Sequence, residues 1–171
     1  MVTTSQQVSQ SRSPAWLAVL FRTRNTTRTV DVALIVVRIA LAWIFFVYGA
    51  QKLFGWFNGL GLDETARIVM EGQAGLKPGK FFAVIGGLTE FGGAIALALG
   101  IVARLAGLAL FVDMVMAMIT ITWTHGLVGG YDLNVALAAL AVVVALLGAG
   151  TFSADAVVEQ RLGVTGESSD P

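Results

Sequence analysis

A long apolar run near the N-terminus constrains the fold more than any other feature of this sequence. The run lies between Val30 and Lys52 and holds about twenty apolar residues, which at ~1.5 Å per residue is the length that a helix needs to cross a bilayer. Arg38 lies inside the run. A charge there costs at least ~2.5–3.5 kcal/mol on insertion scales, so Arg38 requires a partner, an aqueous cavity or a chemical task. The run therefore predicts a membrane-spanning helix that contains a buried arginine.

Three further apolar runs indicate that the chain crosses the membrane four times. The predicted spans are residues 31–51, 81–100, 104–123 and 132–148. The composition agrees, because 56% of the 171 residues are hydrophobic and only 13% are charged, whereas a soluble domain of this size rarely carries so few charges. We predict an all-α fold, in which residues 30–150 form a bundle of four transmembrane helices. The short connection between the second and third spans makes them an antiparallel hairpin.

The N-terminal tail, residues 1–29, is polar but includes a short apolar segment. Ser13 followed by Pro14 is typical of a helix start, and the apolar run that follows is too short to span a bilayer. We predict an interfacial helix over 14–22 that lies in the membrane surface. The alternative is a flexible tail whose apolar residues are incidental.

Two further segments outside the spans carry helical signals. The glycine-rich connection 54–80 is predicted to contain a short helix from Asp63 to Glu71, lying over one mouth of the bundle. The C-terminal tail, 151–171, is polar and is predicted to be helical at Ala154–Leu162.

The distribution of basic residues predicts the orientation of the chain. Six basic residues flank the spans on the side of the two termini, and four lie on the opposite side. The cluster that precedes the first span usually determines orientation, because basic flanks stay in the cytoplasm. We therefore expect an integral protein of a bacterial cell membrane with both termini cytoplasmic.

Residue types that are scarce exclude several classes of function. The chain has no cysteine, which excludes disulfides, thiolate metal sites and iron–sulfur clusters, and its single histidine cannot provide bis-histidine haem ligation. We expect no metal site. Eleven basic and eleven acidic side chains cancel, so no basic patch indicates nucleic acid binding. Any redox role must use a bound organic cofactor or the redox centre of a partner.

Three charged residues are predicted to meet near the middle of the membrane. Counted from the predicted helix ends on the cytoplasmic side, Arg38, Glu90 and Asp113 all lie roughly 12–15 Å deep. Their formal charge is minus one, so either the carboxyl groups share a proton or another cation or donor completes the cluster. The alternatives are that Arg38 and Glu90 simply pair to fix the helix packing, and that Asp113 faces a partner subunit or a water-filled gap.

A second polar set is predicted at the opposite ends of the helices. Aromatic rings, a histidine and charged groups around an apolar interior suit a quinone, whose carbonyls accept hydrogen bonds and whose reduction takes up protons. The alternative to ligand binding for His125 and Tyr131 is that they belong to the belt of such residues at the membrane–water interface. The candidate quinone-binding residues are Tyr48, Lys52, His125, Tyr131, Asp132 and Asn134.

An ordered series of short motifs over about 31–148 resembles the DoxX family of small four-helix membrane proteins. The series contains an arginine in the first span, a Gly-x-x-Lys-x-Phe-Gly run, a glutamate before paired glycines and a late histidine. The stretches are Val37–Ala42, Tyr48–Gly55, Leu88–Gly93, Leu99–Gly100 with Arg104, His125, and Gly130–Asn134. At Asp132 the chain departs from the family pattern, which usually has glutamate there.

The resemblance implies a membrane subunit of an oxidoreductase assembly. Members of the family resemble small subunits of thiosulfate:quinone oxidoreductase, and others are linked to a complex that handles oxidative and thiol stress with superoxide dismutase and a sulfurtransferase. Our leading hypothesis is a subunit that binds a quinone or docks a membrane or peripheral redox protein. The alternatives are a small-solute or proton transporter and a non-catalytic membrane scaffold. Assembly as a homo-oligomer is left open.

Overall fold

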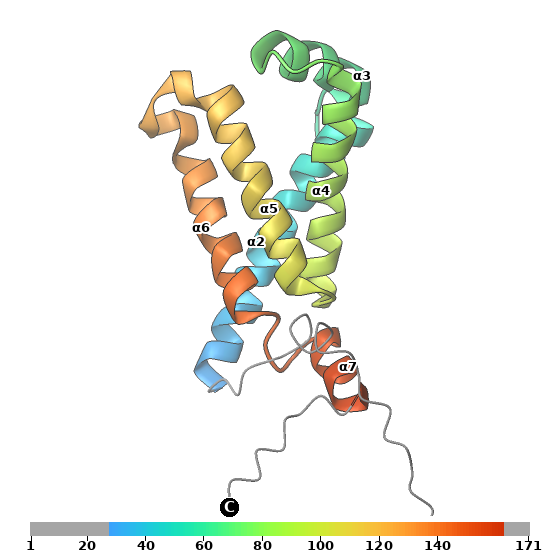
Figure 1. Ribbon diagram of the computed structural model, residues 1–171, viewed down its shortest axis with the longest axis vertical. Coiled ribbons are helices and arrows are strands. Elements are labelled where there is room, and N and C mark those ends of the chain that lie inside the picture. Colours follow the sequence, from blue (N-terminus) through green and yellow to red (C-terminus); the bar gives the residue numbers. More distant parts are fainter. Residues whose placement is uncertain (1–27, 163–171) are drawn as a thin grey trace, which may run out of the picture.

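The computed structural model describes residues 28–162, and they form an all-α bundle (Figure 1). No strand is present among these residues. The predicted fold class is confirmed, whereas the predicted interfacial helix 14–22 lies outside the described residues. The elements are α2 (Arg28–Phe54), α3 (Gly61–Glu64), η1 (Thr65–Gln73), α4 (Gly79–Leu99), α5 (Ala103–Ala117), η2 (Met118–Thr122), η3 (Trp123–His125), η4 (Leu127–Tyr131), α6 (Asp132–Leu147) and α7 (Ala154–Leu162).

Four of the helical segments are long and apolar enough to cross a membrane. They are Arg28–Phe54, Gly79–Leu99, Ala103–His125 and Leu127–Leu147. Large apolar side chains on all four segments point outward, among them Trp43, Leu88, Ile119 and Leu133. Because an exterior of this kind is stable against lipid and not against water, the chain is an integral membrane protein.

The four helices pack as two pairs. α2 packs chiefly on α4, and α5 packs chiefly on α6. The pairs meet near the end of the bundle where α7 lies, here called the tail end, and diverge toward the end that carries α3 and the η2–η4 turn, here called the loop end (Figure 1). The core therefore lies nearer the tail end, where Leu41, Phe45, Leu97, Leu110 and Val144 are fully buried.

Glycine allows α2 and α4 to approach closely at the level of the charged residues. A Cβ atom added at Gly49 would lie 2.5 Å from the backbone nitrogen of Phe91, and one added at Gly87 would lie 2.6 Å from the side chain of Leu53. Close contacts between small residues are a common way for helices to associate in membranes. This contact brings the last turn of α2 against the part of α4 that carries Glu90.

The predicted helical first loop is present as α3 and η1. Ala66 and Met70 are buried against Ala83 of α4, so this loop is packed onto the bundle. Glu71 accepts a hydrogen bond of 2.8 Å from the backbone nitrogen of Gly79, the first residue of α4. The loop therefore helps to fix the start of α4.

At the tail end, α7 is attached beneath the connection between α4 and α5. Its buried Asp155 accepts hydrogen bonds from the backbone nitrogens of Val102 (2.7 Å) and Ala103 (3.0 Å) at the start of α5. On α2, Asp31 accepts hydrogen bonds from the backbone nitrogen and hydroxyl of Thr151. The predicted helix Ala154–Leu162 is thus an integral part of the bundle.

Replacing Asp155 with alanine should lower the stability of the bundle. The substitution removes the acceptor for two backbone N–H groups at a helix start, and loss of such a cap costs about 1–2 kcal/mol. We expect a lower midpoint in thermal unfolding of the detergent-solubilised protein, followed by circular dichroism. The unfolding midpoint of Asp155→Asn, which keeps a side-chain acceptor, should lie between that of Asp155→Ala and that of the unmodified protein. A midpoint for Asp155→Ala equal to that of the unmodified protein would contradict this role.

Candidate functional site

The structure separates the buried charges into two groups, one at each end of the core. Arg38 belongs to the tail end and is 3% exposed. Its guanidinium donates hydrogen bonds to the carbonyl oxygens of Leu97 (2.9 Å), Ala149 (2.6 Å), Phe152 (3.2 Å) and Ala98 (3.4 Å). The arginine therefore joins the end of α4 to the segment that leads into α7.

The predicted meeting of Arg38 with Glu90 and Asp113 is wrong. α2 and α4 are antiparallel, and Arg38 lies level with Leu97, which is two helical turns from Glu90 along α4. Seven residues at ~1.5 Å each separate them by roughly 10 Å. Counting depth from the predicted helix ends placed these residues at one level, but the helix crossing, and not the count, determines the register.

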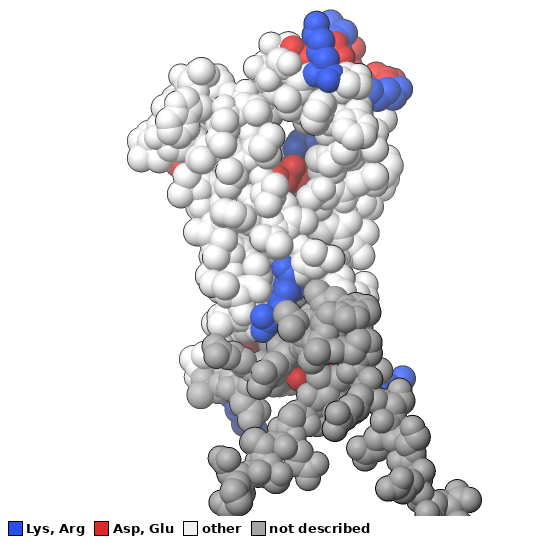
Figure 2. Space-filling model, in the orientation of Figure 1, with Lys and Arg blue, Asp and Glu red and all other residues white. Residues whose placement is uncertain are grey.

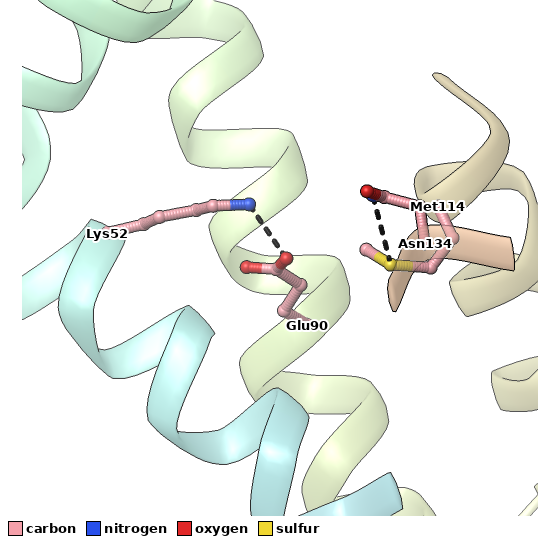
Figure 3. A network of polar contacts seen from close by, with 4 residues as sticks. All are labelled: Lys52, Glu90, Met114 and Asn134. Carbon is pink, nitrogen blue, oxygen red and sulfur yellow. Dashed lines mark hydrogen bonds and ion pairs between the residues drawn. The ribbon is translucent and has the colours of Figure 1, made fainter. Parts of the chain in front are cut away.

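Glu90 forms its ion pair with Lys52 instead. Figure 3 shows the lysine reaching from α2 to the carboxylate on α4, and the distance from Nζ to Oε1 is 2.7 Å. Glu90 is 1% exposed, while the side chain of Lys52 keeps 23% of its surface accessible. The pair thus joins a fully buried acid to a base that still has contact with the surroundings.

Asp113 of α5 completes a three-residue cluster with this pair, hereafter the carboxyl–lysine cluster. Its carboxylate lies close enough to interact electrostatically with both Lys52 and Glu90. Glu90 Oε2 and Asp113 Oδ2 are both buried and lack a hydrogen-bond partner among the described residues. Two carboxylates and one ammonium have a formal charge of minus one. A single proton held between the carboxyl groups would neutralise the cluster and supply the missing donor.

A cavity of about 480 Å³ leads to this cluster between α4 and α5. Figure 2 shows basic and acidic atoms inside a hollow whose rim is formed by uncharged residues. Lys52 and Asp113 are the charged residues of its lining, and Thr89 and Thr120 add hydroxyl groups. The remaining lining is apolar and consists of Met70, Leu76, Phe82, Ile85, Gly86, Leu105, Leu108, Ala109, Val112, Met116, Ala117 and Ile121.

A second hollow, of about 320 Å³, lies between α2 and α4 and has a different character. Apolar side chains line it, among them Ile39, Trp43, Phe46 and Ala98, and no charged residue does. Trp43 is the one lining side chain with a polar atom, its indole N–H, so the hollow has no charged group to orient a ligand and serves below as a comparison site.

The remaining candidate residues lie mainly in the η2–η4 turn at the loop end. Tyr131 stacks on Trp123, with ring centroids 5.2 Å apart, and His125 is exposed in the same turn. Asp132 accepts hydrogen bonds from the backbone nitrogens of Gly129 (3.2 Å) and Leu133 (2.9 Å) at the start of α6. Tyr131, His125 and Asp132 therefore lie in or beside the turn and do not line the cavity.

Asn134 and Tyr48 also lie outside the cavity lining. The amide of Asn134 contacts the hydroxyl of Thr122 (3.2 Å) and the sulfur of Met114 (3.8 Å), the latter visible in Figure 3. Tyr48 is partly exposed on α2, one turn before Lys52. Of the six predicted quinone-binding residues, Lys52 alone belongs to the lining that the described residues form. The divergence of the two helix pairs at the loop end carries the η2–η4 turn away from α2.

The sequence reasoning missed the face of α5 that lines the cavity. Leu105, Ala109, Val112 and Met116 follow helical spacing around Asp113. This periodicity is visible in the sequence and could have identified the residues that share a face with the acid. Among the described residues, no three His, Asp or Glu side chains come together as a metal site requires.

The family comparison covers the part of the chain that forms this cluster. The model of the DoxX family matches residues 33–123, just over half of the chain. The match includes the carboxyl–lysine cluster and the helices that line the cavity, and it ends before α6. No curated protein and no solved structure matches the chain.

Proposed function

The chain belongs to the DoxX family, and we propose that it is a membrane subunit of an oxidoreductase assembly that binds a quinone between α4 and α5. One observation carries this proposal: the lining of a mainly apolar cavity within the membrane-spanning region includes Asp113 and Lys52, and Lys52 is ion-paired with the buried Glu90. Its volume of about 480 Å³ lies in the range of small-molecule sites, ~300–1,000 Å³. Met70 and Met116 give the lining adaptable walls for a ring with an apolar tail.

The polar end of the cavity has the groups that a quinone head requires. A bound quinone would accept two electrons and two protons as its carbonyls become hydroxyls. The Lys52 ammonium has three N–H donors, and Glu90 accepts one of them, which leaves donors for a carbonyl oxygen. Asp113 also lines the cavity, and its carboxyl group in the protonated form would be a second donor. This donor set fits the group.

The electrons would come from the redox centre of a partner protein, since the chain has no cysteine and a single histidine. In the same proposal the protein lies in the cell membrane of a bacterium with both termini in the cytoplasm, and it acts in the response to oxidative or thiol stress. Purification in mild detergent, with mass spectrometry of co-purifying proteins and extracted lipids, tests this part. A stoichiometric redox protein together with quinone supports it, whereas a pure, quinone-free protein argues against it.

Filling the cavity should abolish quinone binding. Ala109 is an exposed residue of the lining, and Ala109→Phe would occupy the space beside Asp113. We expect at least a tenfold weaker affinity for a short-chain ubiquinone or menaquinone analogue, measured by tryptophan fluorescence quenching in nanodiscs. The matched control is Ala98→Phe in the second hollow, which should bind as the unmodified protein does. Equal affinities for the two variants would refute the site assignment.

A further inference from the structure

A third and smaller pocket lies at the loop end and shares Lys52 with the carboxyl–lysine cluster; it is here called the polar pocket, after the Gln51, Asn58 and Thr65 side chains of its lining. It has a volume of about 230 Å³, and its lining includes Gln51, Lys52, Asn58, Thr65 and Val69. Lys52 also lines the apolar cavity between α4 and α5. Lys52 therefore belongs to the lining of two spaces, one bounded by the end of α2 and the first loop and the other mainly by apolar helix faces.

The loop that bounds the polar pocket is held closely against α2. Gln51 donates a hydrogen bond of 3.3 Å to the carbonyl oxygen of Phe57, and the backbone nitrogen of Gly59 donates one of 2.9 Å to Trp56. A Cβ atom at Gly59 would lie 2.5 Å from the Cα atom of Gln51, so only glycine allows this approach. The pocket is therefore a built feature of the fold beside Lys52.

Toward the tail end, the cluster is closed off by the apolar core. Phe45, Ala94 and Leu110 are buried in the core between the level of Glu90 and that of Arg38. The charged and titratable groups that act on Lys52 are Glu90 from α4, Asp113 from α5 and Tyr48 from α2 itself. The polar pocket therefore lies on the loop side of Lys52, and an apolar core lies on the opposite side.

We propose that the carboxyl–lysine cluster exchanges protons with the aqueous phase at the loop end, through the polar pocket and past Lys52. A proton leaves water in the pocket and binds a carboxylate oxygen of Glu90 or Asp113, and it returns by the same path. The unpartnered oxygens of both carboxyl groups are the atoms that hold it. This deepens the proposed function, because a quinone head in the neighbouring cavity would draw its protons from this pair, but the test below uses no quinone.

The absence of native cysteine allows the pocket to be closed in the folded protein. Val69→Cys places one thiol in the polar pocket, and Val112→Cys places one in the apolar cavity as the matched control. Each is capped after folding with benzyl methanethiosulfonate, and mass spectrometry confirms the modification. Rapid-scan infrared spectroscopy after a change to D₂O then follows the carboxyl C=O band, assigned by its loss in Glu90→Gln and Asp113→Asn.

Capping at position 69 should slow the exchange at least tenfold relative to the same sample before capping, while capping at position 112 should leave it within twofold. An unchanged rate after capping at position 69 would overturn the proposal. So would a slower rate after capping at position 112 alone, because the protons would then enter through the apolar cavity. A protein without a carboxyl band that depends on Glu90 or Asp113 would also overturn it. Each of these failures leaves the result of the quinone titration unaffected.

Discussion

Replacing Lys52 with methionine is expected to destabilise the folded protein by roughly 3–5 kcal/mol, because it leaves the charge of Glu90 buried without its partner. Glu90 is 1% exposed, so water cannot take over the role of the ammonium group. Because methionine keeps most of the length of the lysine side chain, the change in stability reports on the loss of charge and not on a loss of packing. Thermal unfolding in detergent at one fixed pH, with reversibility established, measures the change.

Two further variants make this result specific. Lys52→Met combined with Glu90→Gln removes both charges and should recover most of the lost stability, because breaking a buried pair costs more than replacing it. Lys80→Met breaks the surface pair with Asp63, whose side chains are 65% and 84% exposed, and should cost less than about 1 kcal/mol. If Lys52→Met were no more harmful than Lys80→Met, the buried ion pair would have no role in stability.

The elements of this fold follow from local features of the sequence. Each span is a single apolar run, and the length of the run alone predicts a helix that crosses a bilayer. The helical first loop and α7 lie in polar segments, where helix-forming residues are bounded by glycines or by a change in composition. None of these features depends on how distant parts of the chain pack, which explains why the sequence was sufficient to predict them.

The site could not be predicted in the same way, because it depends on the helix register. Arg38 and Glu90 are opposite charges on adjacent antiparallel helices, and the sequence gives no reason to prefer Lys52 as the partner of Glu90. The crossing of α2 and α4 at Gly49 determines which cation pairs with Glu90, because it brings the last turn of α2 to the level of that residue. The backbone of α4 and the α6–α7 segment then satisfy Arg38 with carbonyl oxygens, an acceptor that no charge pattern reveals.

The second large effect is expected at Arg38. Arg38→Leu removes the charged donor from the carbonyl oxygens of Leu97 and Ala149, and hydrogen bonds to charged groups are worth about 1.5–3 kcal/mol each. Leu97 keeps a hydrogen bond from the backbone nitrogen of Gly100, whereas Ala149 is left without the donor that it has in the buried region. It also removes a cation from the C-terminal end of α4, where the helix dipole favours positive charge. We expect a total loss of at least about 3 kcal/mol on this basis. Arg38→Lys should recover only part of it, because one ammonium nitrogen cannot reach carbonyls on both sides as the planar guanidinium does.

The position of Arg38 also predicts where the damage appears. Because its guanidinium bonds to the segment that leads into α7, Arg38→Leu should loosen α7 and speed tryptic cleavage after the exposed Arg161. Binding of the quinone analogue by the fraction that stays folded should be unchanged, since Arg38 is not among the residues that line the cavity. Lys52→Met should have the opposite profile, with weaker binding and an unchanged rate of cleavage after Arg161. If Arg38→Leu weakened binding and left that cleavage unchanged, the buried charges would act as one cluster and not as two.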